Sequence, residues 1–210
     1  MDIPSVSSNV HPNLFSWKDL ENIINFRPLM TGWRVRVPDT EGLPKLWGTD
    51  PWANPEEVSL PASVLKKMID TRVFYIGEMS RCTEKVNEVA LNLENKYKGS
   101  SVDAHLYIGK FVDPHHPFGI HFDMNDNYIV QCEGKTHWKV WDKVENKDQP
   151  QSHLSVEEDP ILDVVLNPGD VINVPAYYPH LAISITPRLS ISFPLMKDVK
   201  LAQERYWIKI

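Results

Sequence analysis

Three segments of the chain carry a helical pattern of apolar residues. The longest lies within residues 78–101, where apolar side chains recur every three or four positions and a glycine ends the repeat. Two shorter helices are predicted nearer the amino terminus, one at residues 16–26 with Ser16 as its N-cap and one with Pro61 in its first turn. The rest of residues 1–70 has little periodicity, so this part is predicted to be an irregular and helical region that packs on a core.

A β pattern begins at residues 72–77 and dominates from Asp103 onward. Short runs of alternating or continuous apolar residues are separated there by turn formers, and about eight strands are predicted. These runs are residues 104–112, 119–123, 127–133, 136–142, 152–156, 163–175, 180–186 and 188–195. Strands at this spacing are typical of a sandwich or a small barrel. The prediction is a mainly β fold with its core at residues 71–200 and a carboxyl-terminal tail at residues 201–210.

The composition is that of an ordinary soluble globular protein. Apolar residues make up 42% of the 210 residues and charged residues 24%. Residues 1–20 lack the basic start and apolar stretch of a signal peptide, and no apolar run reaches the roughly 20 residues of a membrane span. A cytoplasmic location away from membranes is therefore expected. The net charge of −6 and the absence of a basic cluster argue against nucleic acid as a partner.

Histidine and aspartate are placed in the β part as metal ligands are. His121 and Asp123 are two residues apart, so in a strand both side chains point to one face. His180 follows a "PGD" turn, a strand and a second turn, "PAYYP", and it is the best candidate for a third ligand. Two histidines and one carboxylate form the facial triad of non-haem Fe(II) oxygenases, which leaves positions open for cosubstrate and oxygen.

The other histidines are weaker candidates for ligands. His137 alternates with Trp138 and should face away from whatever Trp138 faces. His105 is expected to be a core or pocket residue. The remaining ones lie in loops or at the periphery of the predicted fold: His11, His115, His116 and His153.

Two segments carry a resemblance to a known family. "HFDMNDNYIVQCEGKTHWKVW" and "LNPGDVINVPAYYPHLA" resemble the metal-binding strand and the distal-histidine segment of JmjC-type, cupin-fold 2-oxoglutarate oxygenases. The likeness extends over about residues 72–197 and is greatest to the ribosomal oxygenases and the protein asparaginyl hydroxylases. It implies a double-stranded β-helix, or jelly roll, that binds Fe(II) through His121, Asp123 and His180 and uses 2-oxoglutarate and O2 as cosubstrates.

The residues expected to hold 2-oxoglutarate depart from that family. Its members usually place a cation where this chain has Thr136 and often a threonine where it has Phe118. A substitute cation is present in "PRLSISFPL", where alternation puts Arg188 and Ser190 on the polar face of a strand. A buried arginine without an anion is costly, so an inward Arg188 beside Ser190 is expected to bind the far carboxylate of the cosubstrate. The alternatives are that Arg188 caps the mouth of the barrel or pairs with an acidic side chain. Lys135 is the alternative cation if the register shifts.

Two further residues are candidates for contacts with the cosubstrate. The resemblance places Asn127 near the metal-bound end of 2-oxoglutarate. Tyr107 occupies an inward-facing strand position, where its hydroxyl either bonds a carboxylate or satisfies a backbone group.

The resemblance implies an oxygenase that hydroxylates a C–H bond, with an amino-acid side chain of a protein or peptide as the first choice of substrate. A small-molecule hydroxylase of the same mechanism is the alternative. A cupin iron dioxygenase that does not use 2-oxoglutarate is a second, favoured by the missing cation and threonine. A non-catalytic cupin and a zinc hydrolase receive less support from the residues. The sequence leaves open whether the chain is a monomer or a homodimer.

Overall fold

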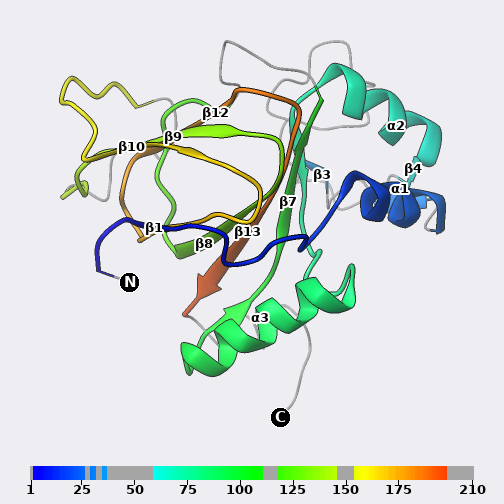
Figure 1. Cartoon of the computed structure of the whole chain (residues 1–210), viewed down its shortest axis with the longest axis horizontal. Helices are drawn as coiled ribbons and strands as arrows, with labels where there is room; N and C mark the ends of the chain where they lie inside the picture. Colours follow the sequence, from blue (N-terminus) through cyan, green and yellow to red (C-terminus); the bar gives the residue numbers. More distant parts are fainter. Residues whose placement is uncertain are drawn as a thin grey trace.

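The computed structural model describes residues 2–26, 29–31, 35–36, 59–110, 118–145 and 154–197. Most of the regular structure is β, and helices lie on one side of it (Figure 1). The strands are β1 (Ser5–Ser7), β2 (Leu29–Thr31), β3 (Val35–Arg36), β4 (Ser59–Pro61), β5 (Phe74–Ile76), β6 (Ser101–Val102), β7 (His105–Gly109), β8 (Asp126–Glu133), β9 (Thr136–Val140), β10 (Leu162–Leu166), β11 (Val171–Val174), β12 (His180–Ser184) and β13 (Arg188–Met196). The helices are α1 (Trp17–Phe26), α2 (Ala62–Thr71) and α3 (Glu84–Lys96).

Two antiparallel sheets form the body of the protein. The larger has the order β1-β11-β8-β13-β7-β5-β3, with β6 also paired to β13, and the smaller has the order β10-β9-β12. From β8 onward the chain crosses repeatedly between them, because β8, β11 and β13 lie in the large sheet and β9, β10 and β12 in the small one. Figure 1 shows the small sheet lying over the large sheet, so that their inner faces enclose the interior. β2 and β4 form a separate two-stranded ribbon.

Strand β13 shows how the sequence assigns side chains to the two faces of the large sheet. Leu189, Ile191 and Phe193 point to the outer face and are fully buried in a cluster with residues of the helices. Burial of each such side chain contributes about 1.5–3 kcal/mol. The alternate residues Arg188 and Ser190 point to the interior between the sheets. The prediction that the polar face of this strand is turned inward is confirmed.

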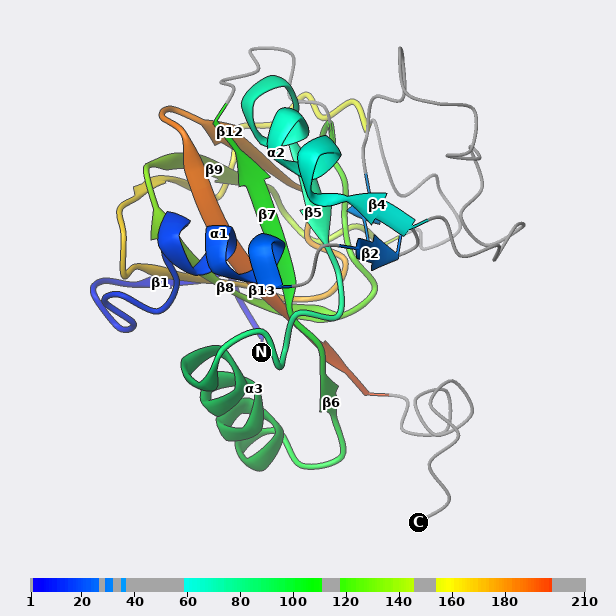
Figure 2. The ribbon, with the colours of Figure 1, turned by 90° about the vertical axis from the view of Figure 1, so that its right-hand side faces the viewer.

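The helices cover the outer face of the large sheet, as Figure 2 shows for α1 and α2 in front of β7 and β13. Helix α1 begins with a capping box, in which the Ser16 and Asp19 side chains each accept the other's backbone N–H. Thr83 caps α3 by accepting the N–H of Val86, and the helix ends at Lys96, three residues before Gly99. In the described part of the chain, no helix is long and apolar enough to cross a membrane.

Some expectations for individual elements were wrong. Pro61 belongs to strand β4 and α2 starts only at Ala62. Residues 119–123 form no regular strand, because only His121 makes a β-bridge. Residues 154–156 are irregular. Local patterns missed these points because strand pairing depends on partners far along the chain.

The amino-terminal part contributes strands to the large sheet that the sequence did not predict. Residues of β1 pair with β11, and those of β3 pair with β5. β1 and β3 thus belong to the same sheet as strands of the predicted core. The division into a region at residues 1–70 and a core at residues 71–200 stays a prediction. Several sequence expectations lie outside the described residues, namely those for His115, His116, His153 and residues 201–210.

Gly134 is expected to be essential for the turn that carries the chain from β8 to β9. Its φ is +70°, and an added Cβ would lie 1.9 Å from the carbonyl oxygen of Pro187, in the segment that crosses back to β13. Gly134→Ala is therefore expected to lower the free energy of unfolding by more than about 2 kcal/mol in urea denaturation. Gly99→Ala is the control, because Gly99 has φ +88° but an added Cβ would meet no atom within 4 Å. This variant therefore measures the cost of the backbone conformation without a steric clash. Equal losses in the two variants would contradict the steric argument.

Candidate metal and cosubstrate site

His121, Asp123 and His180 meet at one end of the interior between the sheets. Their ligand atoms all lie within 4.8 Å of one another, and the His180 Nε2 atom is 3.7 Å from Asp123 Oδ2. The two imidazole rings are 4.3 Å apart between centroids. Two imidazoles and a carboxylate at this spacing fit a single divalent ion held on one face. Their role as ligands remains a proposal.

Backbone hydrogen bonds hold the three residues together although they come from distant segments. His121 and His180 exchange both bonds of a β-bridge, with His121 N–H to His180 O at 3.2 Å and the reverse at 2.8 Å. The Tyr177 N–H donates to the Asp123 carbonyl at 2.8 Å. Tyr177 has φ +68°, a conformation that is unfavourable for a bulky residue. The turn before His180 therefore has a strained backbone. Its hydrogen bond to Asp123 holds the segment of Asp123 next to the segment of His180.

Each histidine is oriented by a carbonyl of its own segment. The Nδ1 atom of His121 lies 3.1 Å from the Gly119 carbonyl oxygen, and Nδ1 of His180 lies 3.0 Å from that of Tyr178. A proton on each Nδ1 leaves both Nε2 lone pairs free for a metal. Burial, and to a lesser extent the proximity of His121, lower the pKa of His180, so this imidazole is neutral at neutral pH.

The Asp123 carboxylate is oriented by a short chain of hydrogen bonds. Asn127 on β8 donates from Nδ2 to Asp123 Oδ2 at 2.6 Å, and Ser192 on β13 donates to Asn127 Oδ1 at 3.0 Å. Ser192 therefore fixes which way the Asn127 amide points, and Asn127 fixes the carboxylate. The family resemblance identified Asn127 as a candidate from the sequence. The signal for Ser192 in the sequence is that it lies on the same face of its strand as Arg188 and Ser190.

Loss of the Ser192 hydroxyl is expected to weaken metal binding. Ser192→Ala frees the Asn127 amide to rotate, and loss of such a supporting contact typically lowers metal affinity by about tenfold. The measurement is isothermal titration of the purified protein with Mn(II). Ser190→Ala is the matched control, because Ser190 lies on the same face of β13 but donates to Gln131. An unchanged affinity in Ser192→Ala, or an equal loss in both variants, would contradict the role assigned to Ser192.

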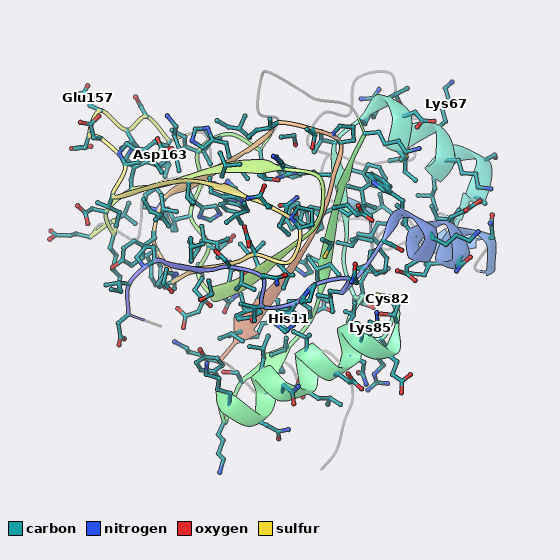
Figure 3. All side chains as sticks on the ribbon, viewed as in Figure 1. His11, Lys67, Cys82, Lys85, Glu157 and Asp163 are labelled. Carbon is teal, nitrogen blue, oxygen red and sulfur yellow. The ribbon has the colours of Figure 1, made fainter. Side chains whose placement is uncertain are left out.

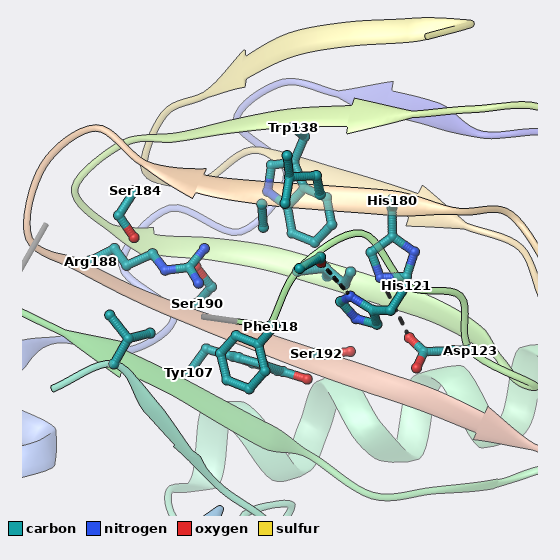
Figure 4. A pocket seen from close by; sticks show the side chains of 15 residues that line it. Tyr107, Phe118, His121, Asp123, Trp138, His180, Ser184, Arg188, Ser190 and Ser192 are labelled. Atoms are coloured by element: carbon teal, nitrogen blue, oxygen red, sulfur yellow. Dashed lines mark hydrogen bonds and ion pairs between the residues drawn. The ribbon is translucent and has the colours of Figure 1, made fainter. Parts of the chain in front are cut away.

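A pocket extends from the three predicted ligands into the interior and encloses about 670 Å³, part of it open to solvent. Figure 4 shows Trp138 of β9 on one side and Tyr107 and Phe118 on the other, with Arg188 at the end away from Asp123. The Tyr107 and Phe118 rings meet edge to face at 5.7 Å between centroids. Burial, and then the Asp123 charge, raise the pKa of Tyr107, so its hydroxyl remains a hydrogen-bond donor at neutral pH.

Arg188 is the cation of this pocket. Its side chain is 3% exposed, and none of the described aspartates or glutamates forms an ion pair with it. Its recorded contact is a weak one, from Nη1 to the Thr136 hydroxyl at 3.5 Å, and its Nε atom has no partner in the described structure. Burial lowers the pKa of Arg188 to about 10, and the guanidinium is still charged at neutral pH. A buried cation without an anion is costly, so among the described residues Arg188 is the side chain best suited to bind an anion in this pocket.

The other predicted cosubstrate residues take different places. Ser190 lines the pocket, whereas Thr136 is fully buried behind Arg188 and does not line it. Asn127 also lies outside the lining and reaches the site through Asp123. Lys135 is exposed in the turn before β9, outside the lining. Of the residues predicted to hold the cosubstrate, Arg188 is thus the cation that lines the pocket.

The other described histidines have partners away from the predicted ligands. His137 contacts Asp163 on the outer face of the small sheet, at the periphery of the fold in Figure 3. His105 stacks on Tyr75 and lies 3.3 Å from an Asp103 oxygen. The His11 Nε2 atom is 2.7 Å from the Tyr128 hydroxyl, so this residue is less peripheral than expected.

Comparison with known proteins identifies the family. The JmjC domain profile matches residues 85–201, more than half of the chain. The chain belongs to the JmjC domain family. The predicted family is therefore confirmed, and the three clustered residues all lie within the JmjC match.

Curated JmjC relatives match a limited part of the chain. The probable ribosomal oxygenase of Haemophilus influenzae is 30% identical over 82 residues, which is 37% of this chain and 20% of that protein. The ribosomal protein uL16 3-hydroxylase of Escherichia coli is 30% identical over 35% of this chain and 21% of its own length. The Drosophila persimilis protein named bifunctional lysine-specific demethylase and histidyl-hydroxylase NO66 is 36% identical over 32% of this chain and 10% of its length. The matches thus span about a fifth or less of these relatives.

Solved structures share the fold. The Escherichia coli ribosomal oxygenase YcfD, in a structure with cobalt and 2-oxoglutarate, superposes with a TM-score of 0.61 at 15% identity. The match covers 99% of this chain and 55% of that one. Together with the two facing sheets, the likeness confirms the predicted mainly β, jelly-roll architecture of the JmjC fold.

Proposed function

We propose that the protein is an Fe(II)- and 2-oxoglutarate-dependent oxygenase that hydroxylates an amino-acid side chain of a protein or peptide. The observation that carries the proposal is one pocket with a cluster of two histidines and an aspartate at one end and, at the other, a buried arginine with no ion pair among the described residues. A dicarboxylate with a 2-oxo group complements both ends. When bound, Fe(II) with 2-oxoglutarate and O2 supplies the oxidation that inserts oxygen into a C–H bond, with succinate and CO2 as coproducts.

The residues of the chain would contribute binding and orientation. His121, Asp123 and His180 would hold the metal on one face and leave its other positions open. Arg188 would hold the far carboxylate of 2-oxoglutarate with charge-assisted hydrogen bonds, and Ser190 lies beside it as a polar neighbour. The side chains of Trp138 and Phe118 would exclude water from the slot between the two ends.

The choice of a protein substrate rests on the family. Relatives with matching segments are named as hydroxylases of a ribosomal protein and of histidyl residues. A small-molecule substrate is the alternative within the same chemistry. A dioxygenase that does not use 2-oxoglutarate would need an anionic substrate of its own to pair with the Arg188 charge at the far end of the pocket.

The deciding experiment is anaerobic addition of Fe(II) and then 2-oxoglutarate to the purified protein. A weak visible metal-to-ligand charge-transfer band is expected in the wild-type protein and should be absent in Asp123→Ala. Iron binding without a band would overturn the use of 2-oxoglutarate and favour a substrate that chelates the metal itself. The substrate class is then tested by aerobic incubation with ribosomal proteins, where mass spectrometry should detect the gain of one oxygen atom on one side chain.

A further inference from the structure

Three buried side-chain polar atoms in the described structure lack a hydrogen-bond partner, and two of them belong to residues that line the same pocket. The three atoms are Ser101 Oγ, Trp138 Nε1 and Arg188 Nε. Trp138 and Arg188 line the pocket, whereas Ser101 belongs to the short strand β6 outside it. Buried polar groups are rarely left unpaired, because an unpaired donor has lost its bonds to water and gained none in return. Two unpaired groups in one pocket therefore point to a ligand that is absent from the structure.

The two unpaired groups are donors from opposite sheets. Trp138 comes from β9 of the small sheet and Arg188 from β13 of the large sheet. Figure 4 shows the indole nitrogen on the edge of the Trp138 ring that is turned toward the Ser184 and Arg188 end of the pocket. An indole N–H and a guanidinium donate hydrogen bonds and accept none. Their missing partner is therefore an acceptor, and beside a buried cation it is an anion.

Neighbouring side chains do not supply that acceptor. Ser190 donates to Gln131 Oε1 at 3.0 Å, and Gln131 donates from Nε2 to the carbonyl oxygens of Glu133 and Gly134. The Thr136 hydroxyl is at 3.5 Å from Arg188 Nη1 and has no recorded bond to the indole. Among the described side chains, Ser190 and Gln131 are thus bonded to each other and to backbone carbonyls, whereas Trp138 Nε1 and Arg188 Nε have no partner.

We propose that Trp138 is a specificity-determining residue, whose indole N–H donates to the carboxylate that Arg188 binds. This inference rests on the proposed function and deepens it, because it assigns the far carboxylate of 2-oxoglutarate a second donor on the opposite sheet. Two donors from two sheets fix the plane of the carboxylate as well as its position. The pair therefore selects a 2-oxo acid with a second carboxylate over one that ends in a methyl group.

The test follows the indole N–H directly. Protein labelled with 15N in its tryptophan side chains and loaded with Zn(II) is titrated with 2-oxoglutarate or with 2-oxopentanoate, which has the same chain length but no far carboxylate. We expect 2-oxoglutarate to shift the one indole resonance that is missing from the spectrum of Trp138→Phe. The shift with 2-oxopentanoate should be much smaller.

Binding constants supply the second arm of the test. Trp138→Phe is expected to raise the Kd of 2-oxoglutarate by about tenfold and to leave that of 2-oxopentanoate unchanged. Trp141→Phe is the matched control, since Trp141 is also buried and its indole donates to the Glu158 carbonyl at 2.8 Å, outside the pocket lining. Its Kd for 2-oxoglutarate should equal that of the wild-type protein.

The outcomes separate this inference from the proposed function. Failure of wild-type protein to bind 2-oxoglutarate overturns both. Normal binding with an unshifted Trp138 resonance, or an equal Kd in Trp138→Phe, overturns the role of Trp138 and leaves the proposed function standing. If Trp138→Phe does not fold, the wild-type titration decides, with the resonance assigned through the backbone.

Discussion

Replacing Asp123 with alanine is expected to lower the affinity for a divalent metal by more than about a hundredfold, because loss of groups that merely support a ligand already costs ten- to a hundredfold. Asp123 supplies the only carboxylate of the described three-residue cluster, and the two imidazoles that remain carry no negative charge to balance that of the ion. The measurement is isothermal titration with Mn(II), or with Fe(II) under anaerobic conditions. The far-ultraviolet circular dichroism of the variant should match that of the wild-type protein.

The fold itself offers a control for this experiment. Asp163 also contacts a histidine, His137, but the pair lies on the outer face of the small sheet and forms no three-residue cluster among the described residues. Asp163→Ala should therefore leave the metal stoichiometry and affinity unchanged. A full metal affinity in Asp123→Ala, or a comparable loss in Asp163→Ala, would refute the ligand set proposed here.

Replacing Arg188 with methionine is expected to have opposite effects on ligand binding and on the stability of the ligand-free protein. Loss of one partner of a buried charged pair costs several kcal/mol, so the Kd of 2-oxoglutarate should rise by on the order of a hundredfold. Without ligand, however, the guanidinium is a buried charge with no anion, and an apolar side chain of similar size removes its desolvation cost. The ligand-free variant should therefore unfold at a higher temperature than the wild-type protein.

The stability measurement distinguishes an anion-binding arginine from a structural one. If Arg188 held the fold together, Arg188→Met would lower the Tm, and that result would contradict the role proposed for it. Lys135→Ala serves as the control for binding, because Lys135 is the alternative cation but is exposed in the turn before β9. A large rise in Kd in Lys135→Ala with little change in Arg188→Met would move the carboxylate contact to Lys135.

Local patterns predicted the parts of the site that depend on strand periodicity. The spacing of His121 and Asp123 predicted that both point to one place, and the alternation in β13 predicted that Arg188 and Ser190 turn inward. The two turns before His180 suggested that this residue opens a strand, and it is the first residue of β12. In β13 the side-chain direction follows from a period of two residues, which the sequence carries in itself, whereas His121 and Asp123 come together without a regular strand at residues 119–123.

Contacts across the two sheets could not be predicted in this way. His121 pairs with His180 through a single β-bridge rather than a regular strand, and the strained backbone at Tyr177 supports it. Nothing in the local sequence pattern indicated that the Trp138 N–H faces the same space as Arg188. The relation between β9 and β13 depends on how both sheets are paired and stacked.

The sequence by itself thus determined the fold family, the three predicted metal ligands and the inward face of β13. Those features are written in short-range periodicity, turn residues and family motifs. Only the tertiary structure decided that Arg188 lies beside Thr136, that Ser192 orients Asn127, and that β1 pairs with β11 at the edge of the large sheet. These contacts join residues that are 50 to more than 160 positions apart, and their geometry is set by register and packing summed over the whole fold rather than by any local run of residues.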